Sequence, residues 1–161
     1  MNPSTSILRM LNHMTSPSSS FSQTSTIDGN SQVQNVGSQL EWFIKDSLSG
    51  TESSGNPQTK QQEHTKVLSY LGGKNHPPDM IIRGGAALEI KKISNPFNPI
   101  QLNSSMPKRS LKFSDSRITQ ECRDCEPYWV EKDLIYVIGA VDKGELTSLF
   151  VFFGDCYVAQ P

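Results

Sequence analysis

The sequence has no long apolar run. None of its hydrophobic segments is long enough to span a bilayer, and the N-terminus lacks the basic and apolar stretches of a secretory signal. We therefore expect a cytoplasmic protein with no membrane partner. Ser and Thr crowd the start of the chain, so we expect residues 1–30 to hold a short helix over 4–14 and a polar, partly disordered linker. A folded domain should then occupy residues 31–161, with the short helix packed on it rather than docked on a membrane or partner.

The chain also lacks a net positive charge, because 15 Lys and Arg residues face 16 Asp and Glu residues. This balance excludes a protein that coats nucleic acid nonspecifically, which needs a basic face. The basic residues are nevertheless concentrated in one strip, which contains a single acid, Asp115. The strip consists of Lys91, Lys92, Lys108, Arg109, Lys112 and Arg117. It is either a contact for DNA backbone or a solvated polar loop.

Cysteine and histidine are scarce, with three of each. Cys122-x-x-Cys125 has zinc-knuckle spacing, but no second pair follows it. A tetrahedral site would need Cys156 and a histidine to converge on that pair. We expect reduced thiols at core or boundary positions instead, as in a reducing cytosol.

The most informative segment present is PDMIIRGGAALEIKK, residues 78–92. Two β-prone apolar runs flank its Gly-Gly pair, which predicts a β-hairpin. Side chains alternate between the two faces of a strand, so the length of the loop decides which residues meet. A two-residue loop sets Asp79 opposite Ile90. A three-residue loop over 83–85, with a glycine in the left-handed region, sets Asp79 opposite Glu89, and this is the loop we predict.

That register would bring two carboxylates together, with Lys91 on the same face. Carboxylates this close raise each other's pKa unless a cation lies between them, which favours a hard ion such as Mg²⁺. Such an ion polarises a phosphate oxygen and activates water, while Lys91 stabilises developing negative charge. The backbone carbonyl of Ile90 is a further candidate ligand. The alternative is a solvated edge strand with alternating charges.

A second pattern predicts a helix over 31–48 that ends at Gly50. Its apolar stripe consists of Val33, Val36, Leu40, Phe43, Ile44 and Leu48. Glu41 and Lys45 lie off that stripe. A surface ion pair between these two residues is one interpretation of Glu41.

Pro78-Asp79 followed by Glu89-x-Lys91 resembles the signature of the PD-(D/E)XK nucleases. Further blocks resemble the NgoPII-like type II restriction endonucleases in amino-acid sequence and in their order along the chain. These blocks are GSQLEWFIKD (37–46), KVLSYLGGKNHPPD (66–79), LEIKKI (88–93), LNSSMPKRSL (102–111), DSRITQECRD (115–124) and EKDLIYVIGAVDK (131–143).

The resemblance implies an α/β fold with a restriction-endonuclease-like core, in which helices flank a mixed β-sheet. It also implies Mg²⁺-dependent hydrolysis of double-stranded DNA at a specific, GGCC-type site, with Asp79 and Glu89 as ligands. Lys91 would position water, and Glu41 would serve as an auxiliary acid. A homodimer would match a palindromic site, and a cognate DNA methyltransferase would act alongside it.

The remaining pattern predicts strands over 66–71, 134–141 and 147–153 and a helix over 114–126. A long irregular segment over 94–113 is the candidate DNA-contact loop. The expected DNA-binding residues are Lys92, Asn103, Ser104, Ser105, Lys108, Arg109 and Arg117.

The chain stops at Pro161, soon after an apolar strand, which favours a C-terminally truncated restriction enzyme. Two other functions stay open. One is a nuclease of repair or resolvase type that reads DNA structure, and the other is an inactive DNA-binding remnant. Cleavage of branched DNA without site preference would identify the first, and binding without any cleavage would identify the second.

Overall fold

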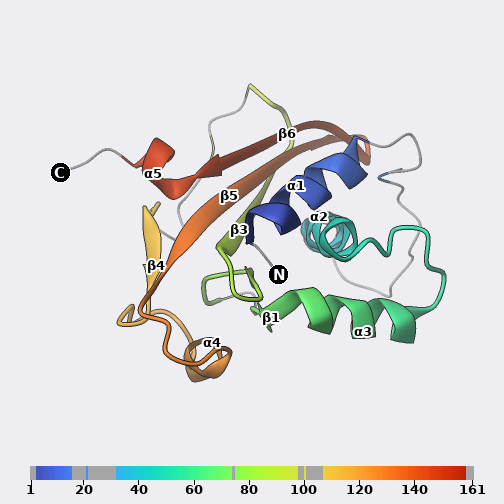
Figure 1. Ribbon diagram of the computed structural model, residues 1–161. Coiled ribbons are helices and arrows are strands. Elements are labelled where there is room, and N and C mark those ends of the chain that lie inside the picture. The colour runs from blue at the N-terminus through green and yellow to red at the C-terminus, as the bar shows by residue number, and fades with distance from the viewer. Residues whose placement is uncertain are drawn as a thin grey trace.

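Short apolar segments between residues 68 and 153 build a mixed β-sheet (Figure 1). The computed structural model describes residues 3–15, 21, 32–73, 75–97, 100 and 107–158. The strands are β1 Leu68–Leu71, β2 Met80–Ile82, β3 Ala87–Ile93, β4 Ser110–Lys112, β5 Glu131–Asp142 and β6 Glu145–Phe153. The helices are α1 Pro3–Met14, α2 Gln32–Ser49, α3 Pro57–Val67, α4 Gln120–Asp124 and α5 Gly154–Tyr157.

β5 organises this sheet. It pairs in parallel with β3 along one edge and antiparallel with both β4 and β6 along the other, and β1 and β2 extend the sheet beyond β3 in antiparallel fashion. Residues of β5 from Leu134 to Val141 are buried, as expected for a strand covered on both faces. The predicted mixed α/β architecture is therefore confirmed, and the predicted strands over 134–141 and 147–153 are β5 and β6.

Two apolar clusters cover the two faces of the sheet. On one face, Leu40, Ile44 and Leu48 of α2 pack with Leu88 and Ile90 of β3. On the opposite face, the cluster contains Tyr70, Ile81, Ala87, Leu111, Ile118, Cys122, Leu134 and Tyr136. Figure 1 shows α1, α2 and α3 together on one side, with β4 and α4 beside the end of β5. Because Leu88 and Ile90 belong to the first cluster and Ala87 to the second, odd-numbered residues of β3 face the second cluster, which includes Leu111 of β4.

Several predicted elements are wrong. Residues Lys66 and Val67, predicted as strand, end helix α3, for which Asn56 is the N-cap and Pro57 the first residue. The predicted helix over 114–126 shrinks to α4, because the Thr119 side chain caps a helix that starts only at Gln120. The segment over 94–113, predicted as irregular throughout, contains β4.

The helix predicted over 4–14 is present as α1, and it packs on the domain as expected. Met10 is completely buried in the cluster with α2, and Ile7 and Met14 pack against that cluster. Cys122 is a buried core residue, Cys125 is half-buried and Cys156 is exposed. No helix within the described residues is long and apolar enough to cross a membrane.

Removing the Met10 side chain should show whether α1 belongs to the folded core. We expect Met10→Ala to lower the free energy of unfolding by about 2–4 kcal/mol, because it leaves a cavity between α1 and α2. Leu8→Ala on the same helix is the matched control, since Leu8 is 66% exposed and should lose only a few tenths. Urea denaturation measures both. Equal losses in the two variants would mean that α1 does not pack on the domain in solution.

Candidate metal-dependent hydrolytic site

The hairpin of β2 and β3 has the predicted three-residue loop. Met80 pairs with Leu88 and Ile81 pairs with Ala87. Continued by one residue, this register sets Asp79 opposite Glu89. The Ile82 N–H donates to the Ala86 carbonyl at 3.0 Å across the loop, and Gly84 adopts a φ of +67°. The prediction of a three-residue loop with a left-handed glycine is confirmed.

A buried ion pair fixes this loop from the neighbouring strand. Lys132 of β5 donates to the Gly85 carbonyl at 3.1 Å and lies 2.6 Å from Glu126 Oε2. The other oxygen of Glu126 accepts the Gly84 N–H at 2.7 Å. Although burial opposes ionisation, the bond from Lys132 and those from Ser69 and Gly84 leave the pKa of Glu126 below its usual value. The turn that sets the carboxylate register is therefore held at both of its glycines.

Asp79 is held against the start of β3. Its Oδ2 atom accepts the Ile90 N–H at 2.5 Å, its own N–H donates to Leu88 O at 3.1 Å, and Gly72 N–H donates to its carbonyl at 2.8 Å. A strand residue presents its N–H and C=O along the same edge. The Ile90 carbonyl therefore lies along the edge of β3 that Asp79 occupies.

Glu89 and Lys91 point from the same face of β3, as the alternation predicts. Lys91 Nζ lies 2.6 Å from Glu89 Oε1, and the Glu89 side chain is only 8% exposed. The second oxygen, Oε2, is buried and has no hydrogen-bond partner. An unpartnered carboxylate oxygen beside a second carboxylate is a place where a cation would lower the free energy of the folded protein.

The electrostatics of Asp79 indicate the same need for a cation. Burial and then repulsion from Glu89 raise the pKa of Asp79 from 3.8 to about 7, although the Ile90 N–H and Lys91 oppose the shift. Glu41 of α2 adds a smaller repulsion, so it lies within electrostatic range of Asp79. No three His, Cys, Asp or Glu side chains among the described residues are close enough to hold one metal together. Glu41 is therefore a neighbour of the carboxylate pair rather than part of a preformed three-carboxylate site.

The surface ion pair considered for Glu41 is not among the ion pairs of the described residues. Lys45 instead lies over the Trp42 ring, 5.1 Å from its centroid.

The predicted DNA-binding residues fall into three groups. Lys92 projects from the face of β3 opposite Glu89 and Lys91, because adjacent strand residues face opposite sides. Lys108 and Arg109 directly precede β4, and Arg117 lies in the segment that follows it. Asn103, Ser104 and Ser105 lie outside the described residues.

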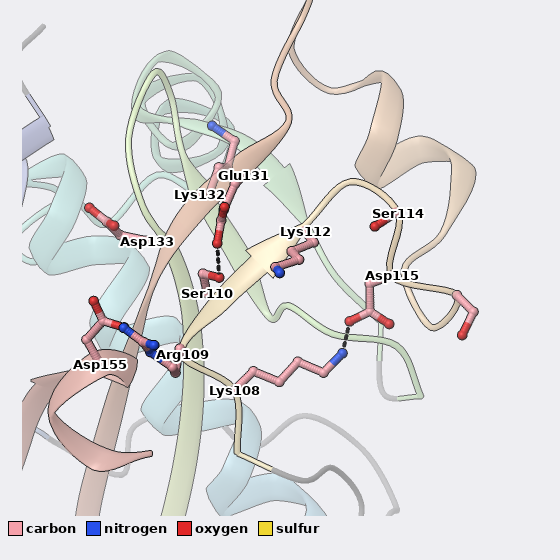
Figure 2. A pocket seen from close by; sticks show the side chains of 11 residues that line it. Lys108, Arg109, Ser110, Lys112, Ser114, Asp115, Glu131, Lys132, Asp133 and Asp155 are labelled. Atoms are coloured by element: carbon pink, nitrogen blue, oxygen red, sulfur yellow. Dashed lines mark hydrogen bonds and ion pairs between the residues drawn. The ribbon is translucent and has the colours of Figure 1, made fainter. Parts of the chain in front are cut away.

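Acidic partners accompany the basic strip near β4. Lys108 pairs with Asp115, Arg117 Nε lies 3.8 Å from the same carboxylate, and Arg109 Nε lies 2.7 Å from Asp155 Oδ1. Of these residues, all but Arg117 line an open groove of about 910 Å³ (Figure 2). The groove is lined by Lys108, Arg109, Ser110, Lys112, Ser114, Asp115, Ser116, Glu131, Lys132, Asp133 and Asp155. It is close to charge-balanced rather than uniformly basic.

Sequence reasoning missed Tyr136, which lies beside Glu89, and His76, which contacts the backbone of Arg117. Tyr136 of β5 is the partner of Glu89 in the parallel ladder, and His76 Nδ1 lies 3.0 Å from the Arg117 carbonyl. The sequence offered one signal for Tyr136, because it is a hydroxyl-bearing residue within an otherwise apolar strand. The register of β3 against β5, which sets Tyr136 beside Glu89, could not be predicted from the sequence.

Comparison with known proteins gives one family and one relative. A family model described as NgoPII restriction endonuclease matches residues 5–161. The type II restriction enzyme NgoPII of Neisseria gonorrhoeae is 41% identical over 132 residues, which are 81% of this chain and 47% of that enzyme. The chain thus spans about half the length of the curated relative it matches. No solved structure matches the chain.

The raised pKa of Asp79 predicts a pH-dependent stability. The folded protein binds this proton more tightly than the unfolded chain, so the stabilisation is present at low pH and is lost as pH rises from 3.8 to about 7. In metal-free buffer, the wild type should therefore lose about 2 kcal/mol relative to Asp79→Asn between about pH 5 and pH 7. The asparagine keeps an acceptor for the Ile90 N–H. Urea denaturation at a series of pH values measures the difference, and parallel pH profiles would contradict the assigned environment.

Proposed function

The chain belongs to the NgoPII restriction endonuclease family, and we propose that it is a type II endonuclease of PD-(D/E)XK type that hydrolyses double-stranded DNA at a specific site. The observation that supports this most directly is the junction of β2 and β3. Asp79 and Glu89 face each other there, with Lys91 bonded to Glu89. Family membership supports the substrate class, and this arrangement supports metal-assisted hydrolysis as the chemistry.

Mg²⁺ is the cofactor we propose. The donor set is a pair of carboxylates with one buried, unpartnered oxygen on Glu89, together with the carbonyl of Ile90, and hard oxygen ligands suit this ion. Asp79, Glu89 and Ile90 would hold it. When bound, the ion supplies a Lewis acid for phosphate and water. Glu41 would contribute through water rather than as a direct ligand.

The residues of the chain itself then have distinct roles. Glu89 holds the Lys91 ammonium at 2.6 Å, which fixes a compact positive charge beside the carboxylate pair. Lys91 orients the attacking water and stabilises the negative charge that develops on the non-bridging oxygens of the phosphate. Cleavage would leave 5′-phosphate and 3′-hydroxyl ends. Lys92, Lys108, Arg109 and Arg117, together with Asn103, Ser104 and Ser105, are the proposed DNA contacts.

We further propose a homodimer, because a two-fold protein matches a palindromic site and cuts both strands. A cognate methyltransferase would protect the host DNA, and the enzyme would act in the cytoplasm, where that DNA is found.

Plasmid cleavage with Mg²⁺ tests the proposal. We expect discrete fragments from the wild type and none in EDTA, and Lys91→Ala should lower the rate at least about 100-fold, because it removes charge stabilisation from the transition state. Lys66→Ala is the matched control, since Lys66 pairs with Glu63 on the exposed face of α3. Its cleavage rate should equal that of the wild type.

The outcomes separate the alternatives. Sequencing the cut ends would give the recognition site. Cleavage of branched DNA without site preference would favour a structure-reading nuclease instead. A folded wild-type protein that leaves DNA intact in Mg²⁺ would contradict the proposed function.

A further inference from the structure

Tyr136 connects the carboxylate strand to the first basic residue of the groove. It lies beside Glu89 in the parallel ladder of β3 and β5, it is only 3% exposed, and its ring stacks on Phe152 with centroids 5.7 Å apart. Its hydroxyl oxygen accepts the Lys108 backbone N–H at 2.7 Å and lies 3.4 Å from the Lys108 carbonyl, to which it donates. Both backbone polar groups of Lys108 are thus bound to one buried side chain.

The same backbone is confined from a second side by α5. A Cβ atom built on Gly154 would lie 2.3 Å from the Lys108 carbonyl oxygen and 2.4 Å from that of Arg109. Only glycine fits such a close approach of two backbones. Asp155, the next residue, accepts a hydrogen bond from Arg109 Nε at 2.7 Å. The position of Lys108 is therefore fixed by tertiary contacts rather than by its own loop.

The side chain of Lys108 belongs to a group of three charges. Figure 2 shows it extending from the chain just before β4 to Asp115, on the loop after β4. Arg117 approaches the same carboxylate at 3.8 Å, so two cations share one anion and leave a net positive charge. The Lys108 side chain is 32% exposed and that of Arg117 is 36% exposed, whereas Asp115 is 7% exposed. The cations therefore face solvent while their shared anion does not.

Arg117 is also linked to the loop that carries Asp79. His76 lies three residues before Asp79, and its Nδ1 is 3.0 Å from the Arg117 carbonyl oxygen. A carbonyl only accepts, so Nδ1 carries the proton. The charged trio is thereby linked to the neighbourhood of both carboxylates, through Tyr136, which pairs with Glu89 in the β3–β5 ladder, and through His76, which precedes Asp79 in the chain.

We propose that Tyr136 is a positioning residue. Its hydroxyl fixes Lys108 relative to Glu89, so that the net positive charge of Lys108, Arg117 and Asp115 binds a DNA phosphate that neighbours the one cleaved. This inference rests on the proposed function. Contacts to phosphate fix the register of a protein on DNA, and a Lys-based contact needs its backbone held in place because its side chain is flexible.

The environment of the Tyr136 hydroxyl suits this role. Burial, and after it the nearby Glu89 carboxylate, raise the pKa of Tyr136 above its usual value, despite opposing contributions from Lys108, Lys91 and Arg117. The phenol therefore stays protonated and keeps both its donor and its acceptor for Lys108 at neutral pH.

A double-mutant cycle with Tyr136→Phe and Lys108→Ala tests the proposal. The phenylalanine keeps the stacked ring and removes only the hydroxyl. We measure binding of a short mixed-sequence DNA duplex, without divalent metal, as a function of salt concentration. Each single variant should weaken binding about fivefold at low salt and make the salt slope shallower by about 1, as expected for one lost phosphate contact. The double variant should lose no more than either single variant, because both act through one contact.

Tyr70→Phe is the matched control. Tyr70 is buried in the same cluster as Tyr136, and its hydroxyl lies 3.2 Å from Thr119 Oγ1, whereas the hydroxyl of Tyr136 bonds the Lys108 backbone. Its removal should leave duplex binding and the salt slope unchanged. The increase in Tm on adding Mg²⁺, which reports the carboxylate pair, should be the same in Tyr136→Phe and wild type.

Each outcome decides between the two proposals. Additive losses in the double variant, or a Tyr136→Phe variant that binds like Tyr70→Phe, would overturn the positioning role and leave the proposed function standing. A folded wild-type protein that does not bind the duplex at all would also overturn the positioning role, whereas plasmid cleavage in Mg²⁺ decides the proposed function separately.

Discussion

Keeping two carboxylates together beside the inner strands of a sheet costs free energy, and the register of the β2–β3 hairpin imposes that cost. Asp79 and Glu89 repel each other, and burial removes the water that would screen them. A slip of one residue would relieve the repulsion by turning one carboxylate to the other face, but it would also turn Met80 and Ile82 out of the apolar cluster that they share with α2. Apolar packing therefore holds the site in an arrangement that its own electrostatics oppose.

The rest of the domain reinforces that register. Lys132 and Glu126 bind both glycines of the turn, and Lys132 belongs to the strand that also carries Tyr136. β5 thus fixes both the turn and the backbone of Lys108. It does so through Lys132 and Tyr136, two side chains on the same face of this strand. One rigid strand therefore fixes the position of the carboxylate pair relative to the groove. Sites held by strands are positioned more precisely than sites held by loops.

The sequence contained enough to predict the centre of the site and too little to predict its surroundings. Side-chain alternation and the Gly-Gly pair determine which residues can meet in the hairpin, so Asp79, Glu89 and Lys91 could be placed together from local rules. The Asn-Pro start of α3 was a readable signal that was missed, because the helix carries little apolar residue periodicity. The limits of α4 were not readable: the Arg123 side chain donates to the carbonyls of Phe113, Asp115 and Ile118, and these contacts hold residues 113–118 outside the helix. The role of Tyr136 depends on strand register across more than forty residues of sequence, which no local pattern encodes.

The pairing of the basic residues with acids changes how a chain with no net positive charge would bind DNA. A uniformly basic face attracts phosphate at any register, whereas Lys108 and Arg117 share one poorly exposed carboxylate and present a single excess charge at a fixed place. A phosphate arriving there competes with Asp115 for cations that are already oriented, so part of the entropy of ordering them has been lost on folding. Binding of this kind contributes modest affinity and a definite position. Under the proposed function, β5 lies between Lys108 and the strand that carries Glu89, so position would matter more than affinity: a phosphate held at Lys108 would align the next one with the carboxylate pair, and a phosphate held elsewhere would not.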